Sequence, residues 1–251
     1  MRRQWRLRAA FWLGVALAAG GAIWTAWPIP GVDPDYRPHV QRPAYGRRGP
    51  HVLIDEAHGN SHTGGGRYRP LAELLSRDGY RVARNRQRLI PELLESQAVL
   101  VVATPRERFG RGELAALETW VAHGGGLLVT GEAPNLTQMF GIRSGGDPRP
   151  AGPWHAHPIF NGRPERGEEV LRIHVATGPA VEGGEPLVQG RVAVVVHGKG
   201  RVVVVGDADL LGAKFEKGGT RGLNEHGFDH PRFALNALHW LSGALGARSR
   251  I

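Results

Sequence analysis

Residues 51–60, with the sequence HVLIDEAHGN, decide the fold. Val52, Leu53 and Ile54 form a short apolar run, which is typical of a strand buried on both faces of a parallel sheet. Polar residues follow directly, and Gly59 allows the backbone to turn sharply. Ligands of open α/β sheets bind beyond the carboxyl ends of the strands. This stretch therefore predicts a central strand and one wall of a site.

Strands and helices alternate after this stretch, which predicts a doubly wound, mostly parallel α/β sheet. The expected strands are 51–55, 80–83, 98–103, 127–130 and 170–176. The expected helices are 69–78, 90–96, 112–123 and one that begins at 229–231. Two further strands, 192–197 and 201–205, flank a short Gly-rich loop and predict an added β-hairpin. Residues 135–153 are rich in Gly, Pro and Arg and are expected to be a surface excursion.

The N-terminal residues predict a membrane anchor. Residues 1–8 contain four arginines, and residues 9–27 contain no charged side chain. About 19 residues at about 1.5 Å rise nearly match a hydrocarbon core of about 30 Å. Arginines on the N-terminal side place that end in the cytoplasm. We expect one transmembrane signal anchor in the inner or cell membrane, followed by a periplasmic or extracellular domain. A cleaved signal peptide is the alternative.

Composition completes the expected organisation. We expect a basic cytoplasmic segment at 1–8, the anchor at 9–27, a Pro/Arg/Gly-rich linker at 28–49, one α/β domain at 50–243 and a tail at 244–251. The formal net charge is +9, but no dense Lys/Arg run with interleaved aromatic residues occurs, so no nucleic-acid partner is expected. The chain has no cysteine, which excludes disulfides, thiolate zinc sites and a Cys nucleophile.

Polar residues cluster where the predicted strands end. The candidate ligand-binding residues are Asp55, His58, Asn60, Thr104, Gly131, Glu132, Asp207 and Asp209. A doubly wound topology brings these ends to one edge, so we expect the side chains to line one crevice. Asp and Asn at such positions also cap helices and turns, and this purely structural role is the alternative for each of them.

The residues suggest little catalytic chemistry. No G-x-S-x-G elbow occurs, and Glu132 occupies the tight turn where a nucleophile would be presented. We expect Glu132 to cap the following helix, although a carboxylate pair such as Glu132 with Asp55 is suited to acid–base work. The side chains of metal-ligand type are Asp55, His58, His62, Asp207, His226, Asp229 and His230. Their spacing matches no metal signature, so neither a metal nor another cofactor is expected.

Several motifs together resemble a known superfamily. They are VLIDEAHGN at 52–60, VVATP at 101–105, LETWVAHGGGLLVTGE at 117–132, HPIFNG at 157–162, GKGRVVVVGDADLL at 198–211 and FALNALHWLSG at 233–243. Their order resembles the class I glutamine-amidotransferase-like superfamily over about residues 50–243. More narrowly, it is similar to two non-catalytic branches: the DUF4350 proteins of bacterial envelopes and the related (GIFT-type) domain of intraflagellar-transport proteins. The resemblance implies a flavodoxin-like sheet with an added β-hairpin.

The same resemblance bears on activity. In catalytic relatives the turn after the GGGLLVTG-type strand carries a Cys, whereas here Glu132 stands at or next to that place. The downstream catalytic His and acid are not identifiable. The resemblance therefore implies a ligand-binding or scaffolding module, with a carbohydrate, a peptide or an envelope protein as its partner. The alternative is a carboxylate- or metal-dependent hydrolase that uses the same crevice.

Overall fold

The computed structural model describes residues 31–46, 48–147, 150–216 and 219–245. The expected basic segment and membrane anchor, 1–27, lie outside the described residues. Within the part that is described, no helix is both long and apolar enough to cross a bilayer.

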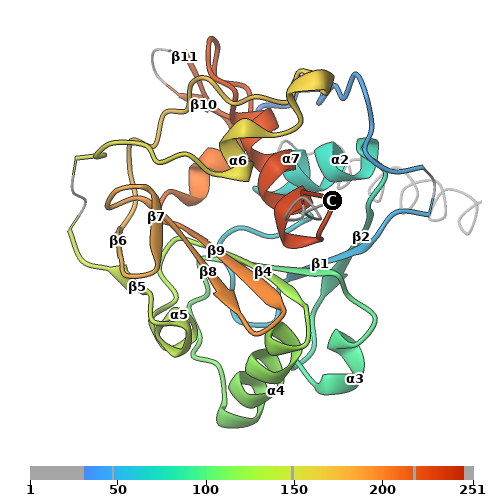
Figure 1. Cartoon of the computed structure of the whole chain (residues 1–251), viewed down its shortest axis with the longest axis vertical. Coiled ribbons are helices and arrows are strands. Elements are labelled where there is room, and N and C mark those ends of the chain that lie inside the picture. The colour runs from blue at the N-terminus through green and yellow to red at the C-terminus, as the bar shows by residue number, and fades with distance from the viewer. Residues whose placement is uncertain (1–30, 47, 148–149, 217–218, 246–251) are drawn as a thin grey trace, which may run out of the picture. The chain divides into compact units, whose positions relative to one another are not determined.

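A seven-stranded sheet forms the centre of the domain, with the strand order β2-β1-β3-β4-β9-β8-β7 (Figure 1). Its strands are β1 (His51–Asp55), β2 (Arg81–Asn85), β3 (Val99–Ala103), β4 (Gly126–Thr130), β7 (Glu185–Val188), β8 (Val192–His197) and β9 (Gly200–Val205). The first five strands in this order are parallel, and β8 and β7 are added antiparallel. The expected mostly parallel sheet and the expected hairpin of β8 and β9 are confirmed.

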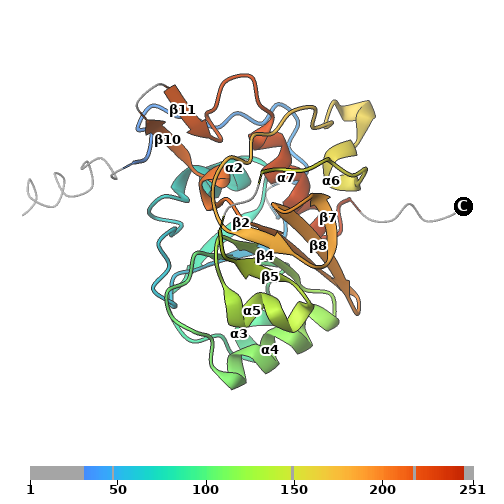
Figure 2. The same cartoon turned by 90° about the vertical axis from the view of Figure 1, so that its left-hand side faces the viewer.

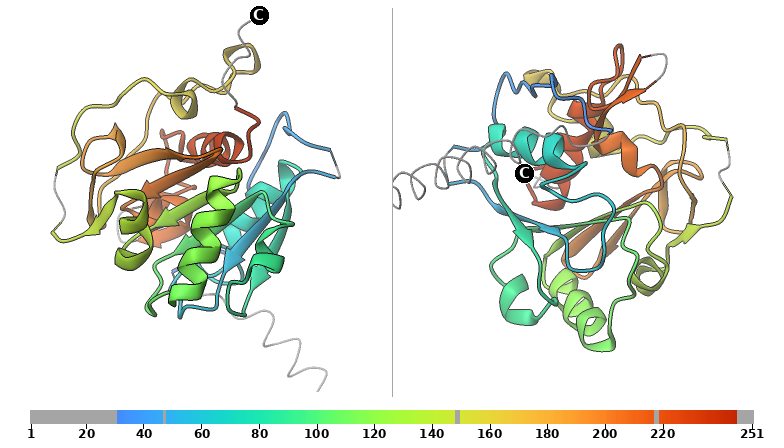
Figure 3. Two further views of the ribbon diagram at one scale, coloured as in Figure 1. Left: turned by 60° about the horizontal axis from the view of Figure 1, so that its bottom comes forward. Right: turned by 180° about the vertical axis from the view of Figure 1, so that it is seen from behind.

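Helices cover both faces of the sheet (Figures 1 and 3). α2 (Arg69–Arg77) and α7 (His230–Leu241) pack on one face, and α3 (Pro91–Leu94), α4 (Arg111–Ala122) and α5 (Pro134–Thr137) lie on the other. Successive side chains of a strand point to opposite faces, so Val52 and Ile54 lie in the core under α2 and α7, and Leu53 lies in the core under α3, α4 and α5. Strands β3 and β4 are therefore buried along their whole length, which explains their unbroken apolar sequences.

Shorter elements surround the sheet. β5 (Arg143–Gly145) pairs with β6 (Ala180–Glu182), and β10 (Ala213–Glu216) pairs with β11 (Gly219–Gly222). The remaining short helices are η1 (Gln138–Phe140), α6 (Pro158–Asn161), η2 (Pro164–Arg166) and η3 (Ala208–Leu211). Figure 2 shows the β10–β11 hairpin on the side of the sheet that α2 and α7 cover.

The described part of the expected linker lies against the domain. Residues 31–46 contain no helix or strand. Val32 is buried, the Ala44 N–H donates to Asp78 Oδ1, and the Tyr45 hydroxyl lies 2.9 Å from Ser242 Oγ. These contacts order the segment without regular secondary structure.

One expected strand, 170–176, is not a strand. Its side chains alternate between exposed and buried from 172 to 176, as the sequence pattern predicted. Three of its backbone N–H groups, however, bond to side chains instead of a neighbouring strand. Asp229 Oδ2 accepts from the N–H groups of Leu171 and Arg172, and His230 Nε2 accepts from His174. Side-chain acceptors have replaced the ladder, so no strand pairing forms.

Candidate functional site

The carboxyl ends of the central strands meet at one edge of the sheet. The Thr104 N–H donates to Thr130 O, and the Gly131 N–H donates to Val205 O, so the residues after β3, β4 and β9 lie side by side. The loop after β1 joins them because the Ser61 N–H donates to Thr104 O. The predicted site residues thus line one edge, but they divide into enclosed networks and accessible groups.

His58 is enclosed between two carboxylates. Its Nδ1 lies 2.8 Å from Asp55 Oδ2, and its Nε2 lies 3.1 Å from Glu113 Oε1. The ring stacks on Phe109 with centroids 3.9 Å apart, and both His58 and Asp55 are fully buried. Because both ring nitrogens are engaged and shielded from water, His58 is not free to act on a substrate.

The electrostatics of this network favour a buried cation. Burial alone would lower the pKa of His58, but the hydrogen bonds and charges of Asp55 and Glu113 outweigh it and raise the pKa. Burial would likewise raise the pKa of Glu113, but two backbone N–H donors, Arg88 and His58 lower it instead. The network joins the loop after β1 to the first turn of α4, and its role is structural.

Asn60 fastens the same loop from inside. Its Oδ1 accepts from the His58 N–H at 3.1 Å, and its Nδ2 donates to Ala103 O at 3.2 Å. Asn60 is buried, and both ends of its amide are occupied. This is the local turn role that Asn often plays, so Asn60 shapes the site without facing it.

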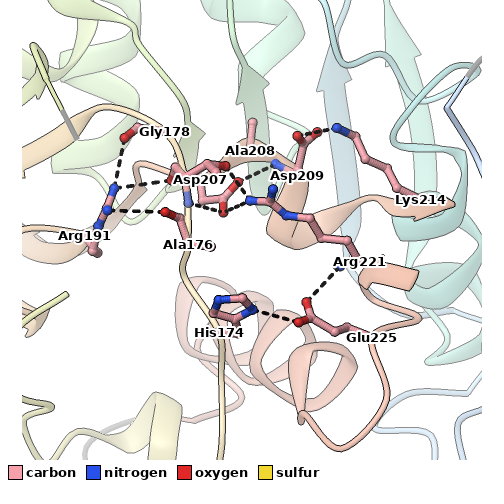
Figure 4. Close-up of polar contacts among 12 residues, drawn as sticks. His174, Ala176, Gly178, Arg191, Asp207, Ala208, Asp209, Lys214, Arg221 and Glu225 are labelled. Atoms are coloured by element: carbon pink, nitrogen blue, oxygen red, sulfur yellow. Dashed lines mark hydrogen bonds and ion pairs between the residues drawn. The ribbon is translucent and has the colours of Figure 1, made fainter. Parts of the chain in front are cut away.

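Asp207 is also enclosed. It accepts hydrogen bonds from the N–H groups of Thr177 and Asp209 and from the Arg221 guanidinium at 2.7 Å. Figure 4 shows Arg221 of β11 reaching across to this carboxylate, which is 2% exposed. Arg191 donates to the carbonyl of Gly178 nearby. Asp207 therefore fixes the β10–β11 hairpin onto the end of β9.

Asp209 belongs to a second, more open network. Its Oδ1 lies 3.0 Å from His62 Nε2, and its Oδ2 accepts from the Lys214 ammonium (Figure 4). On the other side of the ring, His62 Nδ1 lies 3.1 Å from Ser61 Oγ and 3.0 Å from Thr104 Oγ1. Ser61 and Lys214 were not predicted as site residues, and His62 was considered only as a ligand type for metal. The partners are 147 positions apart, so no local motif signals them.

Thr104 and Gly131 both have left-handed backbones at this edge. Thr104 has φ of 44°, and it is the only non-glycine residue with positive φ in the part of the chain that the structure describes. Such a conformation is uncommon for a β-branched residue. Gly131 has φ of 73°, and a Cβ there would lie 2.3 Å from Thr104 Cγ2. The backbone at position 131 therefore lies too close to the Thr104 side chain for any residue other than glycine.

Glu132 faces a cavity of about 490 Å³. The lining residues are Glu132, Gln138, Arg143, Ser144, Gly145, Gly146, Asp147, Ala180 and Glu182. The Glu132 side chain extends toward β5: a Cβ on Gly145 would lie 3.4 Å from its Oε1. Glu132 is exposed, and no described residue donates a hydrogen bond to its carboxylate.

The expectation that Glu132 caps a helix is wrong. The N-cap of α5 is Ala133, and no side chain caps that helix. Pro134 occupies the first turn and has no N–H to donate, and the helix is only one turn long. The carboxylate is left to line the cavity.

The residues considered as metal ligands are not assembled into a metal site. Among the described residues, no group of three or more His, Asp or Glu side chains is placed to hold a metal ion. Asp229 caps the backbone at Leu171 and Arg172, and His230 Nδ1 lies 2.8 Å from Gly222 O. These two side chains satisfy backbone groups.

Comparisons with known proteins agree with this architecture. The family model described as "Domain of unknown function (DUF4350)" matches residues 67–212. No curated protein matches the chain.

Three solved structures are similar in fold. The mmIFT52 N-terminal domain has 17% identity and a TM-score of 0.55, covering 76% of this chain and 97% of its own. A putative ThuA-like protein from Parabacteroides merdae has 11% identity and a TM-score of 0.51, covering 78% and 91%. The cytoplasmic protein STM3548 from Salmonella typhimurium has 13% identity and a TM-score of 0.50, covering 76% and 98%. The predicted resemblance to the glutamine-amidotransferase-like superfamily is confirmed at the level of fold.

Proposed function

This chain belongs to the DUF4350 family, and from that premise we propose that it is an exported, membrane-anchored, ligand-binding module of the bacterial envelope that performs no amidotransferase chemistry. The ligand is an amine-bearing carbohydrate or peptide, and it binds in the cavity beside Glu132. The glutamine-amidotransferase-like fold positions the cavity, and the residues at the turn after β4 determine what binds there.

The observation that carries this proposal is the position of Glu132. It follows Gly131 at the end of β4, at or next to the place where the resemblance puts the nucleophile of catalytic relatives. A carboxylate there forms no thioester, and among the described residues no histidine lines the cavity with it. An exposed carboxylate on a polar cavity is instead suited to accept hydrogen bonds from a ligand.

The charge of the cavity favours a cationic ligand. Of the described residues, Glu132, Asp147 and Glu182 line it with carboxylates, and Arg143 lines it with a guanidinium. Arg143 already lies 2.8 Å from Glu182 Oε2, so its charge is directed at a neighbouring residue. An ammonium group of an amino sugar or a basic peptide would complement the remaining negative charge.

The carboxylate- or metal-dependent hydrolase receives less support from the geometry. His58 and Asp55, the obvious acid–base candidates, are bonded to each other and fully buried. The described residues contain no cluster suited to a metal ion. Among the residues that the structure describes, Glu132 therefore has no histidine beside it in the cavity and no set of metal-ligating side chains around it.

Binding is tested by isothermal titration of the full chain with a glucosamine oligomer and a lysine-containing peptide. Their N-acetylated counterparts serve as uncharged matches. We expect Glu132→Gln to weaken binding about 10- to 150-fold, because a charge-assisted hydrogen bond contributes about 1.5–3 kcal/mol. Glu118→Gln, an exposed glutamate on α4, is the control and should bind normally. Equal affinity for the free and the acetylated ligands would contradict the proposal.

Export is tested separately with a reporter enzyme fused after Pro50. The four arginines before the uncharged residues 9–27 predict that the reporter is active only outside the cytoplasm. Activity of the reporter in the cytoplasm would contradict the topology while leaving the binding site untouched.

A further inference from the structure

We propose that Ser61, Thr104, His62 and Asp209 form a hydroxyl-activating relay through which the chain accepts a small acyl group on Ser61. The inference goes beyond the proposed binding function and does not rest on it, since none of these four residues lines the Glu132 cavity. It rests on a side-chain arrangement that the loop after β1, the end of β3 and the start of η3 assemble together.

The two buried histidines of this edge differ in the partners of their rings. Both nitrogens of His58 face carboxylates. His62 faces a carboxylate with Nε2 only, 3.0 Å from Asp209 Oδ1, and faces two hydroxyls with Nδ1. A histidine placed between a hydroxyl and a carboxylate is the arrangement that activates a nucleophile.

The Asp209 carboxylate sets the tautomer of His62. Burial opposes its ionisation, but the hydrogen bonds of His62 and Lys214 and the Lys214 charge hold the pKa of Asp209 well below its usual range. An ionised Asp209 only accepts hydrogen bonds, so the Nε2 of His62 must carry the proton. The Nδ1 lone pair is then directed at the two hydroxyls. The ring also packs edge-on against Tyr68, with centroids 5.1 Å apart, which fixes its orientation.

Thr104 is held where a relaxed backbone would not place it. Its φ of 44° sets its hydroxyl 3.0 Å from His62 Nδ1 and in contact with the Ser61 hydroxyl. Strained backbone conformations of this kind cluster at functional sites, where the surrounding structure maintains them. Here the maintaining contacts are the Thr104 N–H to Thr130 O and the Ser61 N–H to Thr104 O.

Solvent exposure favours a hydroxyl, and not the imidazole of His62, as the group that reacts with a substrate. Ser61 and Thr104 are half-buried, whereas His62 is buried. Ser61 carries the primary, less hindered hydroxyl, and we assign it as the nucleophile. Thr104 positions it by sharing the His62 nitrogen. The half-buried setting suits small acyl esters, such as an acetyl group on an alcohol.

The reaction balances as acyl transfer followed by hydrolysis. Ser61 Oγ attacks the ester carbonyl carbon, and its proton passes to His62 Nδ1. The bond from the carbonyl carbon to the alcohol oxygen breaks, and the leaving oxygen takes that proton. Water then attacks the acyl carbon of the Ser61 ester and gives a proton to Nδ1. The bond from that carbon to Ser61 Oγ breaks, Nδ1 returns the proton to Oγ, and the carboxylic acid leaves. Asp209 stabilises the imidazolium form in both steps.

The test uses the full chain with a fluorophosphonate probe and p-nitrophenyl acetate. We expect mass spectrometry to find a stable adduct on Ser61 and absorbance to show slow release of nitrophenolate. Ser61→Ala should abolish the adduct, and His62→Gln should slow labelling at least about 100-fold, the usual effect of removing a general base. Ser76→Ala, an exposed serine on α2, is the control and should label normally.

Asp209→Asn and Thr104→Val separate positioning from support of the fold. Both variants keep the shape of the side chain but change the group that bonds to His62, so each should slow labelling of Ser61 about 10-fold or more. The thermal unfolding midpoint of each variant is measured in parallel. Absence of a Ser61 adduct in the folded wild-type chain overturns the inference, whatever the variants do. Labelling at the same rate in His62→Gln overturns it as well. Neither result bears on ligand binding at Glu132, which is tested separately by the titration described above.

Discussion

Replacement of His58 by Gln gives the sharpest test of how the carboxyl edge is held together. The side chain is fully buried and lies 2.8 Å from Asp55 Oδ2 and 3.1 Å from Glu113 Oε1. Removing one partner of a buried ionic network costs about 3–5 kcal/mol, because the remaining charges stay in a medium of low polarity. Glu113 keeps Arg88 and the Leu89 N–H as donors. We therefore expect a loss near the lower end, about 3 kcal/mol.

The loss should depend on pH in a defined direction. The pKa of His58 is raised in the folded chain above its ordinary value of 6.5. A raised pKa means that the folded state binds the proton more tightly than the unfolded state. Its stabilising contribution is therefore complete below pH 6.5 and declines as the pH rises through the folded-state value. The gap between wild type and variant should be widest in mild acid and should narrow in mild base.

Urea unfolding followed by circular dichroism, at a series of pH values, measures this gap as a difference in the free energy of unfolding. His123→Gln is the control, because His123 is exposed at the end of α4, and it should change stability by no more than about 0.5 kcal/mol. A gap below about 1 kcal/mol, or one that stays constant from about pH 5 to about pH 9, would refute the buried-cation account.

Two further predictions concern the neighbouring turns. Gly131→Ala should destabilise the chain by about 1–3 kcal/mol more than Gly141→Ala. The two glycines have φ of 73° and 72°, but only a Cβ at Gly131 would contact Thr104, so equal losses in thermal unfolding would exclude the clash. Asp207→Asn should cost about 3 kcal/mol because it leaves the Arg221 guanidinium without its carboxylate, and amide hydrogen exchange should quicken in the β10–β11 hairpin. Unchanged exchange in that hairpin would show that other contacts hold it.

The strands were predictable because their signals are local. The apolar run after His51 predicted β1 at 51–55, and the apolar sequences at 98–103 and 127–130 predicted β3 and β4. Gly79 and Gly124 directly follow the predicted helices and mark their ends, and the alternation of strands with helices predicted a parallel sheet covered on both faces. Local pattern and the need to bury apolar surface were sufficient.

The same local pattern failed where the tertiary structure supplied a different hydrogen-bond partner. Residues 170–176 alternate like a strand, yet Asp229 and His230 take the backbone donors that a neighbouring strand would have used. Those two side chains lie more than fifty positions away along the chain. The hydrophobic pattern within 170–176 carries no information about Asp229 and His230.

The sequence alone determined that polar residues gather at the carboxyl edge, because strand ends and parallel topology follow from local pattern. Only the tertiary structure decided which of them are enclosed and which are accessible. His58 and His62 lie four positions apart in one loop, yet one ring meets Glu113 from α4 and the other meets Asp209 from η3. The physical reason is that ionisation and access depend on partners brought from distant segments, and sequence spacing carries no record of those distances.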